Sequence, residues 1–407
     1  MLSPTSIADS GRILIVTPQP FYEDRGTPIA IKYVAQALSE LGANVDLLAF
    51  PVGRDVAIPN VHITRCANPL GLTNVPIGFS WKKLALDASL WQSFTRLVHT
   101  GNYALVHAVE EAAYMASVIC PHRGVPFIYD MASAIPVELA RKPLFKPGLV
   151  QRVLLQAERR VIRTARRVVC SSGLGEHVRR QVPDANVREW LYPALMQRVD
   201  ASRAAMLHQD LGLGAHQRVI LYSGNLAAYQ GVDLLIEAFH KLRSTRPELV
   251  LVCVGATERE LRDRGLTMHK GMAMLDNVLI LPRQPREKIP EFLRLADFLV
   301  LPRVNADNVP LKLFDYMASG KPIIATRGAA HEPLLNDSRA FMSEPNPDAL
   351  AAAILRACES PERAATTAAA AQGYARQHFG WSRFVEFIRF TYSDALSEVQ
   401  ELRGQAA

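Results

Sequence analysis

Residues 307–321 read Asp-Asn-Val-Pro-Leu-Lys-Leu-Phe-Asp-Tyr-Met-Ala-Ser-Gly-Lys, and Pro-Ile-Ile-Ala-Thr follows at 322–326. This pattern predicts a loop, then a helix with Pro310 in its first turn and Gly320 at its end, and finally a short buried strand. Asp307 lies in the loop, and Asp315 lies about two turns into the helix. Backbone N–H groups at a helix start favour a phosphate, and carboxylates can hold sugar hydroxyls. The segment therefore predicts a nucleotide-sugar pocket.

The composition is that of a globular protein with two domains. The chain has 407 residues, of which 49% are hydrophobic and 21% charged, so it can bury a large core. Its five cysteines lack metal-ligand spacing, and we expect reduced, core-filling thiols at positions 66, 120, 170, 253 and 358. No apolar run is long enough to span a membrane, and the N-terminus lacks the form of a signal peptide. These features predict a cytoplasmic protein.

The net charge of +7 favours anionic partners such as phosphates or an anionic membrane surface. The sequence contains no zinc finger, helix-turn-helix signature or aromatic RNA-binding motif, so we expect no nucleic-acid partner. We also find no cluster with the spacing of a metal site.

Strand and helix patterns alternate along the chain, which predicts parallel sheets covered by helices. The alternation restarts after a less regular segment at about 190–217, so two halves are expected. Predicted strands are 12–17, 45–50, 105–108, 127–130 and 168–171 in the first half. In the second half they are 218–224, which leads into a glycine turn, and 249–254, 278–281, 298–302 and 322–326. Predicted helices include 31–41, 232–242, 347–359, 363–377 and 382–402.

The 307–321 stretch resembles the donor-binding motif of retaining glycosyltransferases of the GT-B fold, of the family-four type (glycosyl transferases group 1). That family usually has Glu where this chain has Asp307 and Asp315. The resemblance implies an α/β protein with two Rossmann-like, doubly wound domains that face a central cleft. It places an acceptor-side domain at 1–195, a donor-binding domain at 196–380, and a helix that crosses back to the first domain at 381–407.

The resemblance also implies transfer of a sugar from a nucleotide sugar to a hydroxyl, with retention and with no metal or resident cofactor. The nucleotide is of the UDP or GDP type, and the acceptor is a lipid, a saccharide or a natural product. Asp307 would orient sugar hydroxyls, and Asp315 would hold the ribose. The leaving diphosphate would lie at the helix start, near Asn308, Val309, Pro310 and Leu311, with Arg303 and Lys312 as catalytic cations.

One motif departs from the family pattern. Between Gly224 and Gly231 the family usually has an Arg and then a Lys that grip the diphosphate. This chain has Asn225 and Gln230 in those places, which can donate hydrogen bonds but carry no charge. Three basic residues near strand ends or helix starts of the second half could replace the pair: Arg283, Arg303 and Lys312.

In the first half, the turn Arg25-Gly26-Thr27-Pro28 follows the first strand, where the family has a glycine-rich loop near the donor. A plain turn is the alternative. Acceptor-side candidates are His107, Glu110, Asp130, Ala132 and Ser133. Related sequences often have a His in place of Ala132. A lone His after a strand, such as His107, more often has a structural role than a functional one. Glu158 occupies a commonly acidic position, with a solvated or capping role as the alternative.

Two segments carry the features of a membrane-facing surface. Trp81, Lys82 and Lys83 begin a helix at 81–98, which carries an apolar face at Leu84, Ala88, Trp91, Phe94 and Leu97 or Val98. A second helix has a basic stripe at Arg159, Arg160, Arg163, Arg166 and Arg167. Core packing and a solvated face are the more common meaning of such patterns. Peripheral contact with an anionic membrane, at its inner face, is the alternative.

Three other functions stay open. Asn225, Gln230 and Ala132 fit a non-catalytic binding or partner subunit that keeps the fold. A sugar-nucleotide epimerase or a phosphorylase of the same fold is a second alternative, and a membrane-surface scaffold is a third.

Overall fold

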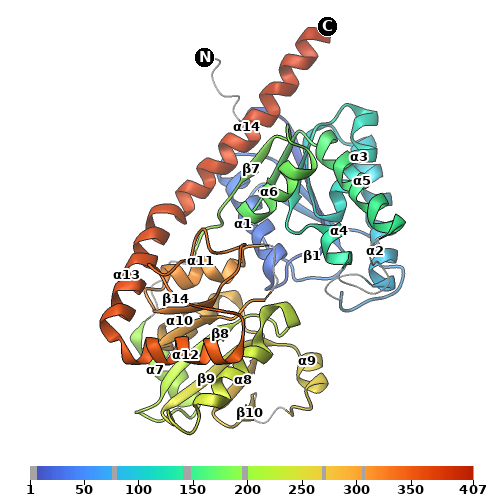
Figure 1. Ribbon diagram of the computed structural model, residues 1–407. Coiled ribbons are helices and arrows are strands. Elements are labelled where there is room, and N and C mark those ends of the chain that lie inside the picture. Colours follow the sequence, from blue (N-terminus) through green and yellow to red (C-terminus); the bar gives the residue numbers. More distant parts are fainter. Residues whose placement is uncertain are drawn as a thin grey trace. The chain divides into compact units, whose positions relative to one another are not determined.

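The computed structural model describes residues 7–75, 80–140, 148–194, 200–267, 272–304 and 308–406 (Figure 1). The chain divides into two compact units. Unit 1 comprises Met1–Tyr192 together with Trp381–Ala407, and unit 2 comprises Pro193–Gly380. Each unit is built around one seven-stranded sheet.

The sheet of unit 1 is parallel throughout its pairings. Its strands follow the order β3 (Val61–Arg65), β2 (Val45–Phe50), β1 (Arg12–Pro20), β4 (Tyr103–Val109), β5 (Phe127–Met131), β6 (Arg167–Cys170) and β7 (Val187–Glu189). The chain winds outward from β1 in one direction and from β4 in the other. The strand order therefore reverses between β1 and β4, and the loops after these strands meet at a topological switch point.

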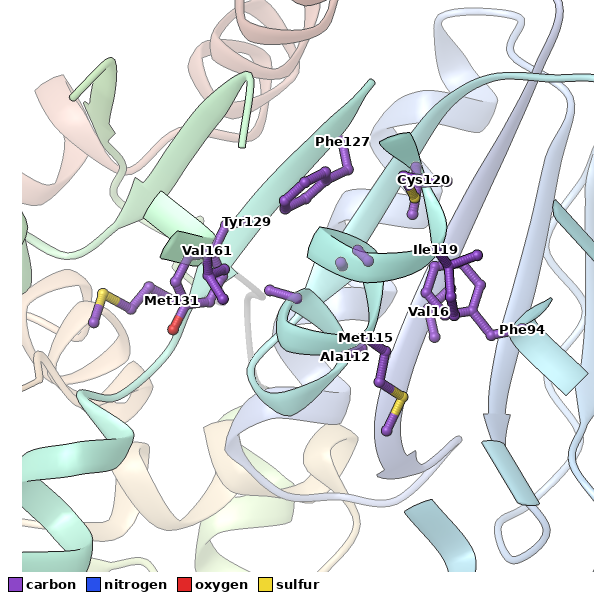
Figure 2. Close-up of a cluster of buried hydrophobic side chains, with 14 of the residues drawn as sticks. Val16, Phe94, Ala112, Met115, Ile119, Cys120, Phe127, Tyr129, Met131 and Val161 are labelled. Atoms are coloured by element: carbon purple, nitrogen blue, oxygen red, sulfur yellow. The ribbon is translucent and has the colours of Figure 1, made fainter. Parts of the chain in front are cut away.

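Helices pack on both faces of this sheet. They are η1 (Ile7–Asp9), α1 (Gly26–Glu40), α2 (Trp81–Thr100), α3 (Glu111–Ile119), η2 (Pro121–Arg123), α4 (Ile135–Ala140), α5 (Leu149–Thr164), α6 (Ser172–Gln181) and α14 (Trp381–Ala406). The largest core cluster joins one sheet face to α2, α3, α5 and α6. Figure 2 shows Phe127, Tyr129 and Met131 of β5 in this cluster, together with Met115 and Ile119 of α3. Helices α1 and α14 contact the sheet and each other.

Helix α14 is tied to unit 1 by polar contacts as well as by packing. The indole nitrogen of Trp381 donates to Glu40 Oε2 over 2.7 Å. Deeper in the unit, the hydroxyl of Tyr392 lies 2.7 Å from His107 Nδ1, and His107 Nε2 lies 3.2 Å from Asp130 Oδ2. These three side chains are buried. They form a polar chain from β5 through β4 to α14, so the last helix completes the interior of the first unit.

The sheet of unit 2 is parallel except for its β10–β11 edge pair. Its strands follow the order β10 (Ala273–Leu275), β11 (Val278–Pro282), β9 (Leu249–Ala256), β8 (Arg218–Ser223), β12 (Phe298–Leu301), β13 (Ile323–Thr326) and β14 (Phe341–Ser343). The order reverses between β8 and β12, so this sheet also has a switch point. The sequence-based expectation of doubly wound sheets is confirmed for both units.

The helices of unit 2 are α7 (Ala201–Asp210), η4 (Ala228–Gln230), α8 (Val232–Leu242), α9 (Glu258–Asp263), η5 (Arg286–Lys288), α10 (Ile289–Leu295), α11 (Leu311–Ala318), α12 (Pro347–Glu359) and α13 (Pro361–His378). The prediction that Gly320 ends α11 is confirmed, because it has a φ of +72° directly after the C-cap Ser319. The prediction for Pro310 is wrong by one position. It is the N-cap residue, with a ψ of 137°, and the helix begins at Leu311.

All five cysteines are free and buried, as expected of core-filling thiols. Within the described residues, no helix is both long and apolar enough to cross a membrane.

The contact between α14 and His107 predicts a stability cost for removing one hydroxyl. Tyr392→Phe leaves a buried ring nitrogen of His107 without its partner, so we expect a loss of about 1–3 kcal/mol in the free energy of unfolding, measured by urea denaturation. Tyr374→Phe is the matched control, because that hydroxyl has no hydrogen-bond partner among the described residues. Equal effects of the two substitutions would contradict the prediction.

Candidate functional site

In unit 2, the loop after β8 is shaped by two glycines with positive φ. Gly231 has a φ of +71°, and a Cβ there would lie 1.7 Å from the carbonyl oxygen of Pro302. Gly224 has a φ of +148°, and a Cβ there would lie 2.5 Å from Lys312 Nζ. No other residue fits at either place without displacing its neighbours. The loop after β8 is thereby held close to the end of β12 and the start of α11.

Lys312 extends from the first turn of α11 toward this loop. Its Nζ donates to Gln230 Oε1 over 3.1 Å and lies 3.9 Å from the centre of the Tyr222 ring. Burial lowers the pKa of Lys312 well below its usual value, and the nearby charge of Arg303 lowers it further. An anion placed beside the ammonium would favour its charged form. The structure therefore puts an amine, which a bound anion would hold in its charged form, where the loop itself has the uncharged Gln230.

Arg303 is buried, with 3% of its surface exposed, and follows β12. Its guanidinium donates to both the backbone oxygen and Oδ1 of Asn308, each over 2.9 Å, and lies 5.6 Å from the ring centre of Tyr229. Arg303 therefore holds the residues that lead into α11, next to Val309 and Pro310. Asp307 falls on residues 305–307, outside the described part of the chain.

Asp315 is almost fully buried on α11 and forms a two-pronged ion pair with Arg286. The two nitrogens of Arg286 donate to Asp315 Oδ2 over 2.5 Å and to Oδ1 over 3.1 Å. Sequence reasoning missed Arg286, since nothing near it signals a partner 29 positions later. The pair ties the segment after β11 to α11 and fixes the orientation of the Asp315 carboxylate.

The other two donor-side candidates lie in the same region. The side chain of Asn225 accepts from the backbone N–H of Ala227 over 3.3 Å, so it shapes the turn. Arg283 follows β11, and its backbone N–H donates to the oxygen of Ala256. Its guanidinium is partly buried and has no hydrogen-bond partner among the described residues.

In unit 1, the structure moves two acceptor-side candidates into the interior. His107 is fully buried with both ring nitrogens engaged, and Asp130 is buried beside it. Their prediction as acceptor-contacting residues is corrected, because β4, β5 and α14 enclose them. His107 therefore has the structural role that was the alternative to acceptor contact. Ala132 and Ser133 lie partly buried in the turn between β5 and α4.

Glu110 lies at the switch point of the first sheet. Its Oε2 accepts from Gln19 Nε2 over 2.8 Å, and Gln19 Oε1 accepts from Arg25 over 2.8 Å. Glu110 has a φ of +48°, which is uncommon for a residue with a side chain. Burial, followed by the charge of Glu111, raises the pKa of its carboxyl to about 8. A polar chain thus links the ends of β1 and β4.

Gly26 and Thr27 form the first turn of α1, with Arg25 as its N-cap residue. Gly26 is exposed, and an added Cβ would meet nothing within 4 Å, so the backbone does not require a glycine there. Residues 26 and 27 are thus helical, and the expectation that they contact the donor stays a prediction.

Three further candidates are internal, contrary to the solvated or membrane-facing roles considered for them. Glu158 is buried, with its Oε2 2.8 Å from His177 Nε2. Lys83 is buried and paired with Glu111. Arg167 is buried, 3.5 Å from Asp394 on α14. Phe94 and Val98 of α2 are core residues as well, whereas Leu84 and Trp91 are exposed.

Among the described residues, no group of three or more His, Cys, Asp and Glu side chains is arranged to hold a metal ion.

Comparisons with known proteins identify two family models. The model of glycosyl transferases group 1 matches residues 205–374, and that of the glycosyl transferase 4-like domain matches residues 25–193. Two relatives are named D-inositol 3-phosphate glycosyltransferase. The one from Thermobispora bispora is 24% identical, covering 92% of this chain and 91% of the relative. The one from Acidothermus cellulolyticus is 26% identical, covering 92% and 86%.

Solved structures also resemble this chain. Sucrose-phosphate synthase from Thermosynechococcus elongatus has a TM-score of 0.76 at 18% identity, covering 95% of this chain and all (100%) of that one. Anabaena HepE (Alr3699) in complex with UDP-glucose has a TM-score of 0.71 at 18% identity, covering 94% and 100%. At this level of identity the likeness is one of fold.

The raised pKa of Glu110 predicts a change in how stability depends on pH. The folded protein holds this proton more tightly than the unfolded chain, whose usual value is 4.5, so unfolding releases a proton between about pH 4.5 and about pH 8. Stability contributed by this group is therefore lost as pH rises through that window. Glu110→Gln lacks the group, so its melting temperature should fall less across the window than that of the native protein.

Glu237→Gln is the control, because Glu237 is exposed on α8. It should keep the pH profile of the native protein. If Glu110→Gln also keeps that profile, the carboxyl of Glu110 titrates normally and the prediction is wrong.

Proposed function

Since the chain belongs to the glycosyltransferases of the GT-B fold and family-four type, we propose that it is a retaining enzyme that uses a nucleotide-sugar donor. The observation that carries the donor assignment is the position of Lys312. Its ammonium reaches Gln230 and Gly224, which belong to the loop where the family usually has its own lysine. The cation comes from α11 instead, and it supports diphosphate binding at the same loop.

The proposed reaction breaks the bond between the anomeric carbon and the leaving phosphate oxygen. The acceptor hydroxyl forms the new bond on the same face, and the departing phosphate takes its proton. Lys312 stabilises the negative charge that develops on the phosphate, and Arg303 holds the start of α11 in place for it. Asp307 keeps the sugar-orienting role that the family resemblance implies. With these cations the proposal requires no metal ion.

Asp315 is proposed to bind the ribose together with Arg286. Each oxygen of a carboxylate has two lone pairs, so a carboxylate that a guanidinium holds in place is also able to accept from a ribose hydroxyl. A rigid carboxylate–guanidinium pair is therefore suited to a vicinal diol, in which each hydroxyl both donates and accepts.

The names of the similar proteins suggest which substrates to test first. HepE is described in complex with UDP-glucose, and the curated relatives are named for D-inositol 3-phosphate. We propose UDP-glucose as the first donor and a phosphorylated polyol as the first acceptor. Lipid, saccharide and natural-product acceptors follow in the same assay.

A non-catalytic, sugar-nucleotide-binding subunit is the second candidate. Ala132 favours it, because a methyl group replaces the imidazole that related sequences often have there. Donor binding without transfer or hydrolysis, across the acceptor panel, would establish this second candidate and exclude the enzyme.

Moving the cation between two positions tests the proposed function. Lys312→Gln should lower kcat/KM for sugar transfer by about a hundredfold, as expected when one charge-stabilising group is lost. Gln230→Lys added to this variant should restore at least about tenfold, because the new ammonium starts from the residue that Lys312 contacts. Transfer from UDP-glucose is measured by UDP release, and proton NMR reads the anomeric configuration of the product.

Arg356→Gln is the control, because it removes a cation on α12 that donates to Met342. It should leave kcat/KM unchanged. A product with inverted configuration would reject the retaining mechanism. Unchanged turnover in Lys312→Gln would reject the donor site.

The ribose assignment predicts a change in selectivity for Arg286→Ala. Loss of the guanidinium leaves Asp315 buried and unoriented, so the preference for UDP over 2′-deoxy-UDP should fall by about tenfold. Binding is measured by calorimetry, with Arg294→Ala on α10 as the control. A role in folding alone would lower the melting temperature and leave the ratio of the two affinities unchanged.

A further inference from the structure

Helix α5 exposes a group of large apolar side chains at its beginning. Leu149 is 76% exposed, Val150 50% and Val153 59%. Single exposed apolar residues are ordinary on protein surfaces, but these three occur within five successive positions of one helix. In Figure 1 this helix lies beside α3 and α4, both of which it contacts.

The exposed side of the same helix is basic. Arg152, Arg160 and Arg163 are exposed, and none of them has an ion-pair or hydrogen-bond partner for its side chain among the described residues. The acidic residue of α5, Glu158, is buried and bonded to His177. The solvent side of α5 therefore carries arginines without any compensating acid of its own.

The helix period places the apolar and basic residues on one face. At about 100° per residue, Leu149, Val153, Arg160 and Arg163 project in similar directions. Glu158, Val161 and Ile162 project the opposite way and are the buried residues of α5. The exposed face thus carries Leu149 and Val153 near the start of α5, with Arg152 beside them, and Arg160 and Arg163 near its end.

We propose that this face of α5 is a docking surface for an anionic phospholipid membrane. The apolar side chains would enter the boundary between headgroups and acyl chains, and the arginines would lie among the lipid phosphates. The chemistry on both halves of the face fits such a surface. The proposal is independent of the donor site, which lies in unit 2.

A second copy of this chain fits the face less well. A two-fold contact of α5 with itself would put the arginines of one helix either beside those of the other, with the helices parallel, or over its apolar residues, with the helices antiparallel. Neither arrangement places an exposed acid of α5 beside the arginines. A polyanion such as nucleic acid would pair with the arginines but would leave the three apolar side chains in water. A membrane surface satisfies both halves at once.

The experiment is co-sedimentation of the full chain with vesicles. We expect binding to vesicles of equal parts phosphatidylglycerol and phosphatidylcholine, and none to phosphatidylcholine alone. Arg160→Gln with Arg163→Gln should weaken binding by about fivefold per arginine. Leu149→Ser with Val153→Ser should weaken it by more than about tenfold, because the apolar area that enters the membrane is lost.

Met274→Ser with Arg376→Gln is the matched control, since it removes one exposed apolar and one exposed basic side chain from unit 2. It should bind as the native protein does. The proposal is overturned if the native chain binds neither vesicle, or if the α5 variants and the control bind equally. It is also overturned if gel filtration shows a dimer that Leu149→Ser with Val153→Ser converts to a monomer while vesicle binding is absent.

Discussion

The donor-side geometry depends on one close approach, between Gly231 and the carbonyl oxygen of Pro302. A side chain at position 231 would require its first carbon 1.7 Å from that oxygen, and the φ of +71° is itself costly for other residues. Because the loop after β8 can pass this close to the end of β12, the backbone N–H of Val304 reaches the oxygen of Tyr229 over 3.1 Å. Gln230 then lies within reach of Lys312. Without this approach, the cation on α11 and the loop after β8 would not form one site.

The same approach explains how the chain tolerates the absence of basic residues at positions 225 and 230. A binding site requires a charge at a point in space, and the side chain that supplies it can start from any nearby element. Lys312 starts on α11 and ends at Gln230. The sequence could identify Lys312, Arg303 and Arg283 as candidates because they follow strand ends or begin a helix. It could not rank them, since their distances from the loop are set by the packing of β8 against β12.

Much of the fold could be predicted because strong local patterns coincide with the packing. The expected ranges 45–50, 232–242 and 347–359 coincide with β2, α8 and α12. The strands β3, β7, β10 and β14 were missed. Two of them, β3 and β7, are partly exposed strands at the sheet edges. Another, β14, is buried but only three residues long. Such strands exist because a neighbouring strand offers its backbone groups, which a local pattern does not record.

In the first unit, the sequence could not show which polar residues are buried by elements that lie far away along the chain. His107 lies in β4 and Glu110 directly follows that strand, and the sequence alone does not distinguish these two polar residues. Tyr392, 285 positions later, covers His107. Glu110 instead lies at the carboxyl end of β4, where its Oε2 accepts a hydrogen bond from Gln19. The basic residues around α5 divide in the same way. Arg167 enters the interior and meets Asp394 of α14, while Arg163 stays exposed, with no acidic partner in the part of the chain that the structure describes. The C-terminal helix therefore makes His107 and Arg167 part of the internal structure of the first unit.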